Sequence, residues 1–224
     1  MEKEARDHIL AVVKAGVSGV PMVGGTLASL IGDYIPSATQ KTIERSIEML
    51  QTEVEKLGGR IDTEALNKDE FSELFKSCYL TIVRTHQEAK LRGAVGLITN
   101  ILLKEEDTEK LSYTELDHFA RCLDVLSVGA IRILGHCVEL TTSRGRIRSN
   151  TPNLRMDFSD VYRRVSDMPV DLIMGLLEEL NSFHLVHLTG VPSGRTPSYG
   201  NYPIELPPIG IRFSKYILKQ GQRL

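Results

Sequence analysis

Apolar residues recur every three or four positions through most of the first half of the chain, a spacing that matches one face of an α-helix. The repeat is clear in residues 37–57, 69–85 and 89–103. No segment in this half alternates apolar and polar residues as a half-buried β-strand does. We therefore expect residues 1–110 to form a bundle of helices. In the first of these helices the apolar face consists of Ile43, Ile47, Leu50, Val54 and Leu57.

An uncharged stretch from Ala15 to Gly32 precedes these helices, and its 18 residues include five glycines and one proline. A membrane-spanning helix needs about 20 strongly apolar residues, and the stretch is too short and too diluted for that. It also lacks the GxxxxGK[ST] and GxGxxG patterns of nucleotide-binding loops. We expect a buried, glycine-rich helical hairpin. The alternative is a hairpin that the bundle stores and a trigger releases into a membrane. The residues assigned to this packing or membrane hairpin are Val20, Pro21, Val23, Gly24, Gly25, Leu27, Leu30 and Ile31.

Composition bounds the size and the charge of the protein. With 224 residues, 42% of them hydrophobic, the chain can bury one large core or two small ones. A formal net charge of −2 argues against a surface built entirely for nucleic acid. Residues 1–110 carry 14 Lys and Arg against 18 Asp and Glu, whereas residues 111–224 carry 13 against 11. Any surface for a polyanion is therefore expected in the second half.

The three cysteines, Cys78, Cys122 and Cys137, are an odd number and show no CxxC spacing. This usage is typical of a reducing compartment rather than of a disulfide framework. The opening residues MEKEARDH mix acidic and basic side chains and do not resemble a signal peptide. We expect a cytoplasmic protein.

The second half begins with a strong helix signal. Ser112 and Glu115 have the spacing of an N-terminal capping box. The apolar repeat that follows extends to Leu140, and Gly129 and Gly135 predict a kink or a division into two helices. A polar loop comes next.

The remaining order of elements is that of a winged helix. Residues 158–167 predict a short helix, 169–183 a longer one and 185–190 a short strand. After a segment rich in glycine and proline, a second strand runs into a terminal helix. The fold class expected for the whole chain is therefore mainly α, with a helical bundle over 1–110 and a winged-helix-like unit over 111–224.

The charges in this unit do not favour DNA reading by its central helix. Residues 169–183 contain Asp171, Glu178 and Glu179 and no Lys or Arg, so DNA phosphates would repel them. Basic residues gather instead between residues 144 and 164, either as a solvated surface or as contacts for nucleic acid. They are Arg144, Arg146, Arg148, Arg155, Arg163 and Arg164.

No catalytic motif accompanies these features. His118 and Cys122 lie one helical turn apart, which favours core packing over a metal site with its four ligands. His184 and His187 are expected to point to opposite faces of a strand. The patterns GxSxG and HExxH are absent. We expect no enzymatic activity, no metal, no cofactor and no small-molecule substrate.

One resemblance adds to this account. The segments DEFSELFKSCYLTIVRTHQEAKLRGAVGLITNILL, ELDHFARCLDVLSVGAIRIL and LLEELNSFHLV, followed by IGIRF, lie within residues 65–217. Their order resembles that of the bacterial abortive-infection alpha proteins. The resemblance implies a small cytosolic bacterial protein linked to phage defence, with no catalytic residues to carry over.

Three functions are consistent with these observations. The leading expectation is a non-enzymatic interaction protein that acts through contacts with a protein partner or with copies of itself. The first alternative is a winged-helix regulator that binds nucleic acid through the arginines at 144–164. The second is a helical-bundle effector that enters membranes conditionally through residues 15–32.

Overall fold

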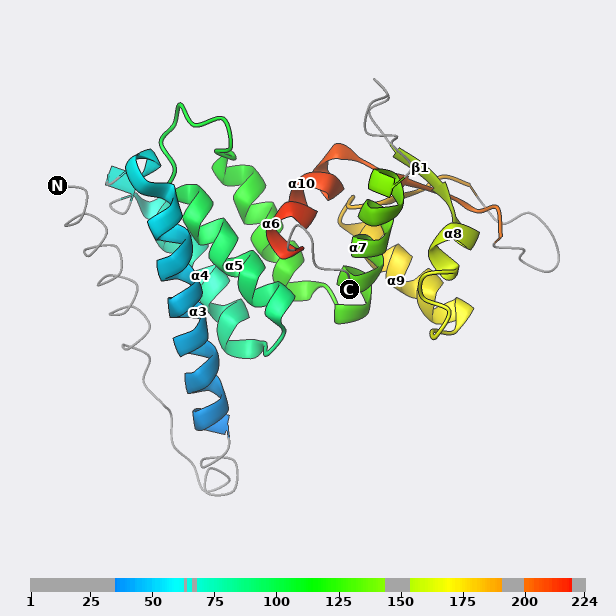
Figure 1. Cartoon of the computed structure of the whole chain (residues 1–224), viewed down its shortest axis with the longest axis horizontal. Coiled ribbons are helices and arrows are strands. Elements are labelled where there is room, and N and C mark those ends of the chain that lie inside the picture. Colours follow the sequence, from blue (N-terminus) through cyan, green and yellow to red (C-terminus); the bar gives the residue numbers. More distant parts are fainter. Residues whose placement is uncertain (1–34, 63, 66–67, 144–153, 191–199, 219–224) are drawn as a thin grey trace. The chain divides into compact units, whose positions relative to one another are not determined.

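The computed structural model describes residues 35–62, 64–65, 68–143, 154–190 and 200–218, and in these residues the chain is mainly helical with a small antiparallel sheet (Figure 1). The chain divides into two compact units, Met1–Asp124 and Val125–Leu224. The expected boundary at 110/111 lies one helix earlier than this division.

The named elements of the first unit, in its described residues, are helices joined by loops, as the apolar spacing predicts. Its first three α-helices begin and end within a few residues of the expected positions. The elements are α3 (Ile35–Leu57), the 3-10 turn η1 (Gly58–Arg60), α4 (Asp69–Arg84), α5 (Glu88–Ile101) and α6 (Tyr113–Val125).

Helices α3 and α4 both pack on α5 and on each other. The core between them is made of leucine, isoleucine, valine and alanine side chains that are almost fully buried, and its members include Leu50, Val54, Leu74, Leu91, Ala94, Leu97 and Ile98. Burial of such side chains is the main source of stability in a bundle of this kind.

Helix α6 belongs to the first unit because hydrogen bonds tie both of its ends to other helices of that unit. At its start, the Tyr113 hydroxyl donates to Glu73 Oε2 of α4 at 2.7 Å. Near its end, Lys90 Nζ of α5 donates to the carbonyl oxygen of Asp124 at 3.1 Å. These contacts explain why the division of the chain follows α6 instead of preceding it.

Two loops of the first unit are joined by an ion pair. Arg60 donates from Nε and Nη2 to the two carboxylate oxygens of Asp107, at 2.6 and 2.8 Å. Beside it, Ile61 forms an isolated antiparallel bridge with Leu103. The guanidinium and the Glu109 N–H, which also donates to this carboxylate, lower the pKa of the Asp107 carboxyl to about 2.

The second unit alternates helices with short strands. The expected polar loop before residue 158 ends in a strand, which the pattern of residues does not predict. The elements are α7 (Val128–Ser143), β1 (Leu154–Asp157), α8 (Phe158–Tyr162), α9 (Val170–Ser182), β2 (His187–Leu188), β3 (Pro203–Leu206) and α10 (Pro208–Ile217).

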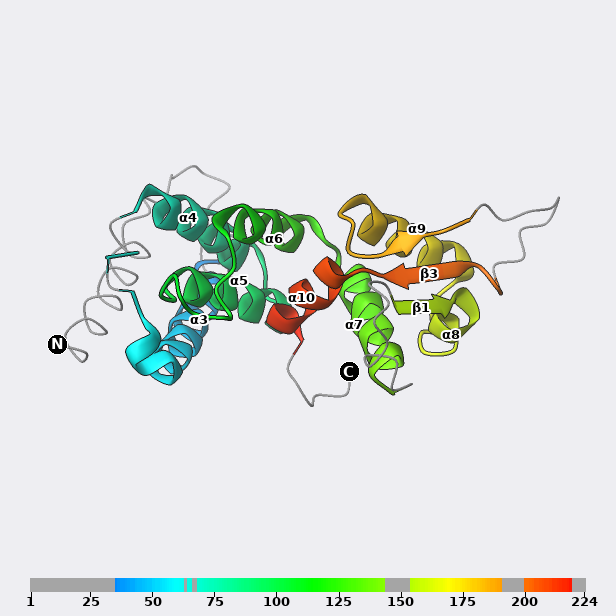
Figure 2. The same cartoon turned by 90° about the horizontal axis from the view of Figure 1, so that it is seen from above.

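The sheet has the strand order β1-β3-β2, and both pairings are antiparallel. Figure 2 shows β1 and β3 side by side. Leu154 lies opposite Leu206, and Met156 lies opposite Ile204. These four side chains are buried, so one face of the sheet covers the core of the unit.

The expected division into two helices is confirmed, but the break lies between α6 and α7, ahead of Gly129 and Gly135. Ser127 caps the N-terminus of α7. Its Oγ accepts a hydrogen bond from the Ala130 N–H at 3.1 Å and so satisfies a donor of the first helical turn. Gly129 serves packing instead. A Cβ on it would lie 2.8 Å from Cδ1 of Leu176 on α9.

Gly210 allows another close approach in the second unit. A Cβ there would lie 2.1 Å from the carbonyl oxygen of Leu185. Helix α10 can therefore lie this close to the Leu185 backbone only because the residue at position 210 has no side chain. One turn further, Phe213 is fully buried.

Candidate functional site

Helix α9 is held by an apolar stripe and leaves its opposite side exposed. It follows Pro169, whose fixed φ suits the start of a helix. Asp171 stands in the first turn, where a negative charge is favourable. The side chains that face the core are Ile173, Met174, Leu176, Leu177 and Leu180.

The exposed side of α9 carries two acids, one leucine and one glycine. Asp171, Leu172, Gly175 and Glu178 are exposed and follow one another at helical spacing. Leu172 is a large apolar side chain that keeps 48% of its surface exposed. We call these four residues the α9 face.

Glu179 is not part of the α9 face, although the sequence groups it with Glu178. Its carboxylate accepts hydrogen bonds from the backbone N–H of Ser127 at 2.5 Å and from the Ser127 hydroxyl at 2.8 Å. Glu179 therefore fixes the start of α7. Sequence alone could not separate its role from that of its neighbour, because the difference depends on a residue 52 positions away.

The glycine of the α9 face has no packing role that the described residues explain. A Cβ on Gly175 would meet no atom within 4 Å, in contrast to Gly129 and Gly210. Glycine in the interior of a helix costs up to about 1 kcal/mol relative to alanine. The α9 face thus contains a destabilising residue at an exposed position.

The end of α9 departs from the expectation for its histidines. His184 has φ = 56°, and the N–H of Leu185 donates to the Leu180 carbonyl at 3.0 Å, as in a Schellman motif. His184 occupies the position at which glycine is usual. The prediction that His184 and His187 point to opposite faces is wrong, because this turn brings their rings to 5.9 Å, edge to face.

Comparison of the chain with protein-family models, with curated proteins and with solved structures finds no match.

The arginines predicted as nucleic-acid contacts fall into two groups. Arg144, Arg146 and Arg148 lie outside the described residues. The other three are exposed, but two of them lie next to acids. Arg155 on β1 stands directly opposite Glu205 on β3, and Arg163 Nη1 is 3.7 Å from Asp160 Oδ1. Arg164 is exposed on the same turn as Arg163.

These acids reduce the positive field that nucleic acid would meet at the described arginines. Directly opposed residues of an antiparallel pair have Cβ atoms about 5 Å apart, so the Glu205 carboxylate largely offsets the charge of Arg155.

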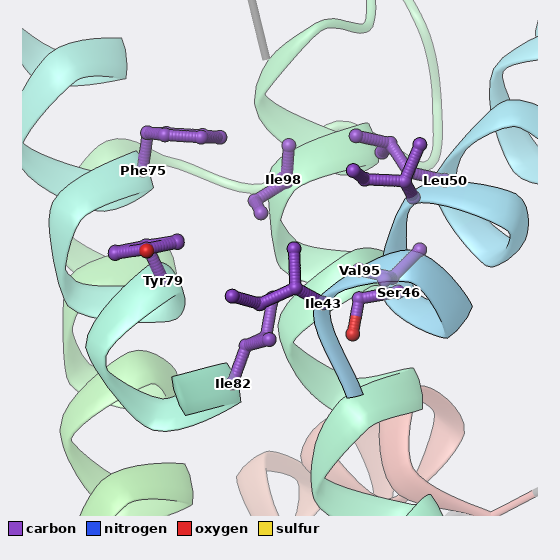
Figure 3. Close-up of a pocket in the computed structure, with 9 residues that line it drawn as sticks. Ile43, Ser46, Leu50, Phe75, Tyr79, Ile82, Val95 and Ile98 are labelled. Carbon is purple, nitrogen blue, oxygen red and sulfur yellow. The ribbon is translucent and has the colours of Figure 1, made fainter. Parts of the chain in front are cut away.

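The predicted packing or membrane hairpin at residues 15–32 lies outside the described residues. In the part of the chain that the structure describes, no helix has both the length and the apolar character that crossing a membrane requires. The helix that follows the hairpin, α3, lines a pocket with α4 and α5 (Figure 3).

The three cysteines are free and buried. Burial raises the pKa of the Cys78 and Cys137 thiols to about 12, which disfavours the nucleophilic thiolate. Cys122 lies 3.6 Å from the Nε2 of His118, a single contact within one helix. No group of three or more metal-ligating side chains occurs among the residues described by the structure.

Proposed function

We propose that the chain is a non-enzymatic interaction protein that binds a protein partner through the α9 face. The observation that carries this proposal is Gly175. A side chain at this exposed position would have open space and would stabilise the helix, so the fold supplies no reason for glycine. A residue without a Cβ lets the backbone of a partner approach α9 closely.

The neighbours of Gly175 define the chemistry of the partner. Leu172 supplies an exposed apolar anchor, and Asp171 and Glu178 place two negative charges on the same flank of the helix beside it. The complementary surface is an apolar pocket bordered by Lys or Arg.

The topology of the second unit supports a winged-helix assignment within this proposal. Helix, strand, helix, helix, strand, strand is the order of that fold, and the antiparallel sheet joins the last two strands to the first. In this assignment α9 takes the place of the DNA-recognition helix. Its acids would repel phosphates, so we assign it to protein recognition rather than to reading bases.

Site-specific photo-crosslinking in cells tests the proposal. A photoreactive residue replaces Leu172 in one protein and Leu80 on α4 in the control, because both leucines are 48% exposed. We expect a protein adduct at position 172 that is absent at position 80 and that is lost with Glu178→Lys. An adduct with twice the mass of the chain would identify a second copy as the partner.

A DNA titration at two salt concentrations provides the opposing test. Affinity that falls steeply as salt rises, with loss of binding in Arg164→Ala, would favour the arginines and nucleic acid over the α9 face. We expect no such binding.

The cellular setting is part of the same proposal. We place the protein in the bacterial cytoplasm and assign it to phage defence. This part of the proposal rests on the resemblance over residues 65–217 and on the free cysteines, which are typical of a reducing compartment. Phage plating on cells with and without the protein tests this setting. We expect fewer plaques with the wild-type chain and full plating with Glu178→Lys.

A further inference from the structure

An apolar groove opens in the first unit between α3 and α4, with α5 as its floor. Figure 3 shows Phe75 and Tyr79 of α4 facing Ile43 and Leu50 of α3. Its lining is Ile43, Ser46, Ile47, Leu50, Phe75, Tyr79, Ile82, Val95 and Ile98.

The groove suits hydrocarbon rather than a polar ligand. Its lining carries no charged side chain. Ser46 also offers no unmet donor, because its hydroxyl donates to the Thr42 carbonyl at 2.8 Å.

Both lips of the groove are partly exposed. On α4 the rings of Phe71, Phe75 and Tyr79 stack along the helix, with centroids 5.9 and 6.3 Å apart. Phe71 is buried, whereas Phe75, Tyr79 and Ile47 on the α3 lip are only half-buried. The described residues therefore leave an apolar surface that further contact would cover.

We propose that this groove holds the chain's own uncharged segment, residues 15–32. The first argument is reach. Ile43 and Leu50 lie roughly 12 and 22 Å along α3 from its start at Ile35, at about 1.5 Å per residue. A chain that turns back just before α3 needs about 15 residues to run that distance as a helix, and fewer when extended. Residues 15–32 supply enough in either conformation.

The second argument is chemistry at the right place in the sequence. The start of α3 at Ile35 is the reference point for this comparison. The apolar residues Leu27, Val23 and Val20 lie before Ile35 by about the same numbers of residues as Ile43 to Leu50 lie after it. A chain that reverses direction just before α3 therefore brings them beside the groove. Neither surface carries a charge that burial would have to desolvate.

The third argument is tethering. A short connection to α3 keeps the segment at an effective concentration in the millimolar range, which favours it over a free competitor or a second copy. This inference is independent of the α9 face, which lies in the other unit.

A tryptophan reporter tests the inference, because the chain contains no Trp. In the full chain, Leu27→Trp places one fluorophore in the segment. Docking predicts blue-shifted emission and protection from acrylamide. Adding Ile47→Asp puts a carboxylate on the groove lip and should shift the emission to the red and abolish most of the protection. The matched control Leu80→Asp adds the same charge on α4 outside the groove lining and should leave the signal unchanged.

Each remaining outcome decides against the inference. Exposed Trp in the Leu27→Trp chain means that the segment is not docked. Protection that survives Ile47→Asp means that the segment is buried elsewhere. Protection of the tryptophan from acrylamide that falls as the protein is diluted means that the groove binds the segment of a second copy. Circular dichroism verifies folding, and Tyr79→Lys on the opposite lip replaces Ile47→Asp if that variant unfolds, because the lysine stem preserves apolar contact.

Discussion

Glu179 of α9 and Ser127 at the start of α7 form a two-point contact, in which one carboxylate accepts from both the N–H and the hydroxyl of the serine. Ser127 Oγ in turn accepts from the Ala130 N–H. The contact joins two helices that also pack closely at Gly129 and Leu176. The two neighbouring acids therefore have different roles. Glu179 stabilises the packing of α9 against the start of α7, whereas Glu178 is exposed.

This division of tasks predicts unequal effects of two similar variants. Glu179→Ala leaves two donors of Ser127 without their acceptor and should lower the free energy of unfolding by about 1–2 kcal/mol. Glu178→Ala removes an exposed side chain and should change it by less than about 0.5 kcal/mol. Urea unfolding monitored by circular dichroism measures both. Equal losses would contradict the assignment.

The glycines predict stability changes of opposite sign. Gly175→Ala should stabilise the protein by about 0.5–1 kcal/mol, because helix propensity improves and the new Cβ meets nothing. Gly210→Ala should destabilise it by about 1–3 kcal/mol, because the new Cβ would overlap the Leu185 carbonyl. Thermal unfolding of the two variants beside the wild type measures both changes. A Gly175→Ala variant less stable than wild type would mean that the fold itself requires this glycine.

The helices could be predicted from the sequence because their signals are local. The apolar stripe with Ile43, Leu50 and Val54 identifies α3 without knowledge of its neighbours. Strand β1 could not be predicted in this way. Leu154 and Met156 alternate with Arg155 and Asp157, but four residues are too few to distinguish a strand from a polar loop.

The candidate site could be predicted only in part. The acidic character of α9 is visible in its composition. The roles of Gly175 and Glu179 are not, because each is defined by what does or does not lie across from it in space. The same holds for Arg155, whose neighbour Glu205 is 50 residues away in the sequence.

The turn after α9 predicts a stabilising substitution. His184 adopts φ = 56°, a conformation that costs a residue with a Cβ about 1 kcal/mol. His184→Gly should therefore raise the free energy of unfolding by about that amount. His187→Gly is the matched control, since His187 lies in β2 and gains nothing from glycine. Chemical denaturation distinguishes them, and a His184→Gly variant less stable than wild type would show that the side chain outweighs the backbone strain.

Acid should weaken the ion pair between Arg60 and Asp107. The guanidinium, together with the Glu109 N–H that donates to the same carboxylate, lowers the pKa of Asp107 from its ordinary value of 3.8 to about 2. A lowered carboxyl pKa contributes stability that is complete above pH 3.8 and is lost as the pH falls toward about 2. In Arg60→Gln this part of the pH dependence should become smaller, and the part due to the Glu109 N–H, which also donates to Asp107, should remain. Urea midpoints measured across that pH range test it, and identical curves for the two proteins would contradict the coupling.

The most direct test of the proposed function substitutes Gly175 and measures whether a partner is still crosslinked at position 172. Gly175→Gln adds a polar side chain into open space, so the variant should be at least as stable as wild type. If a partner approaches α9 closely at this position, the photo-crosslinked adduct from position 172 should be lost in this variant while its melting temperature is maintained. An adduct formed equally well with glutamine at position 175, or no protein adduct from position 172 in the wild-type background, would contradict binding through the α9 face.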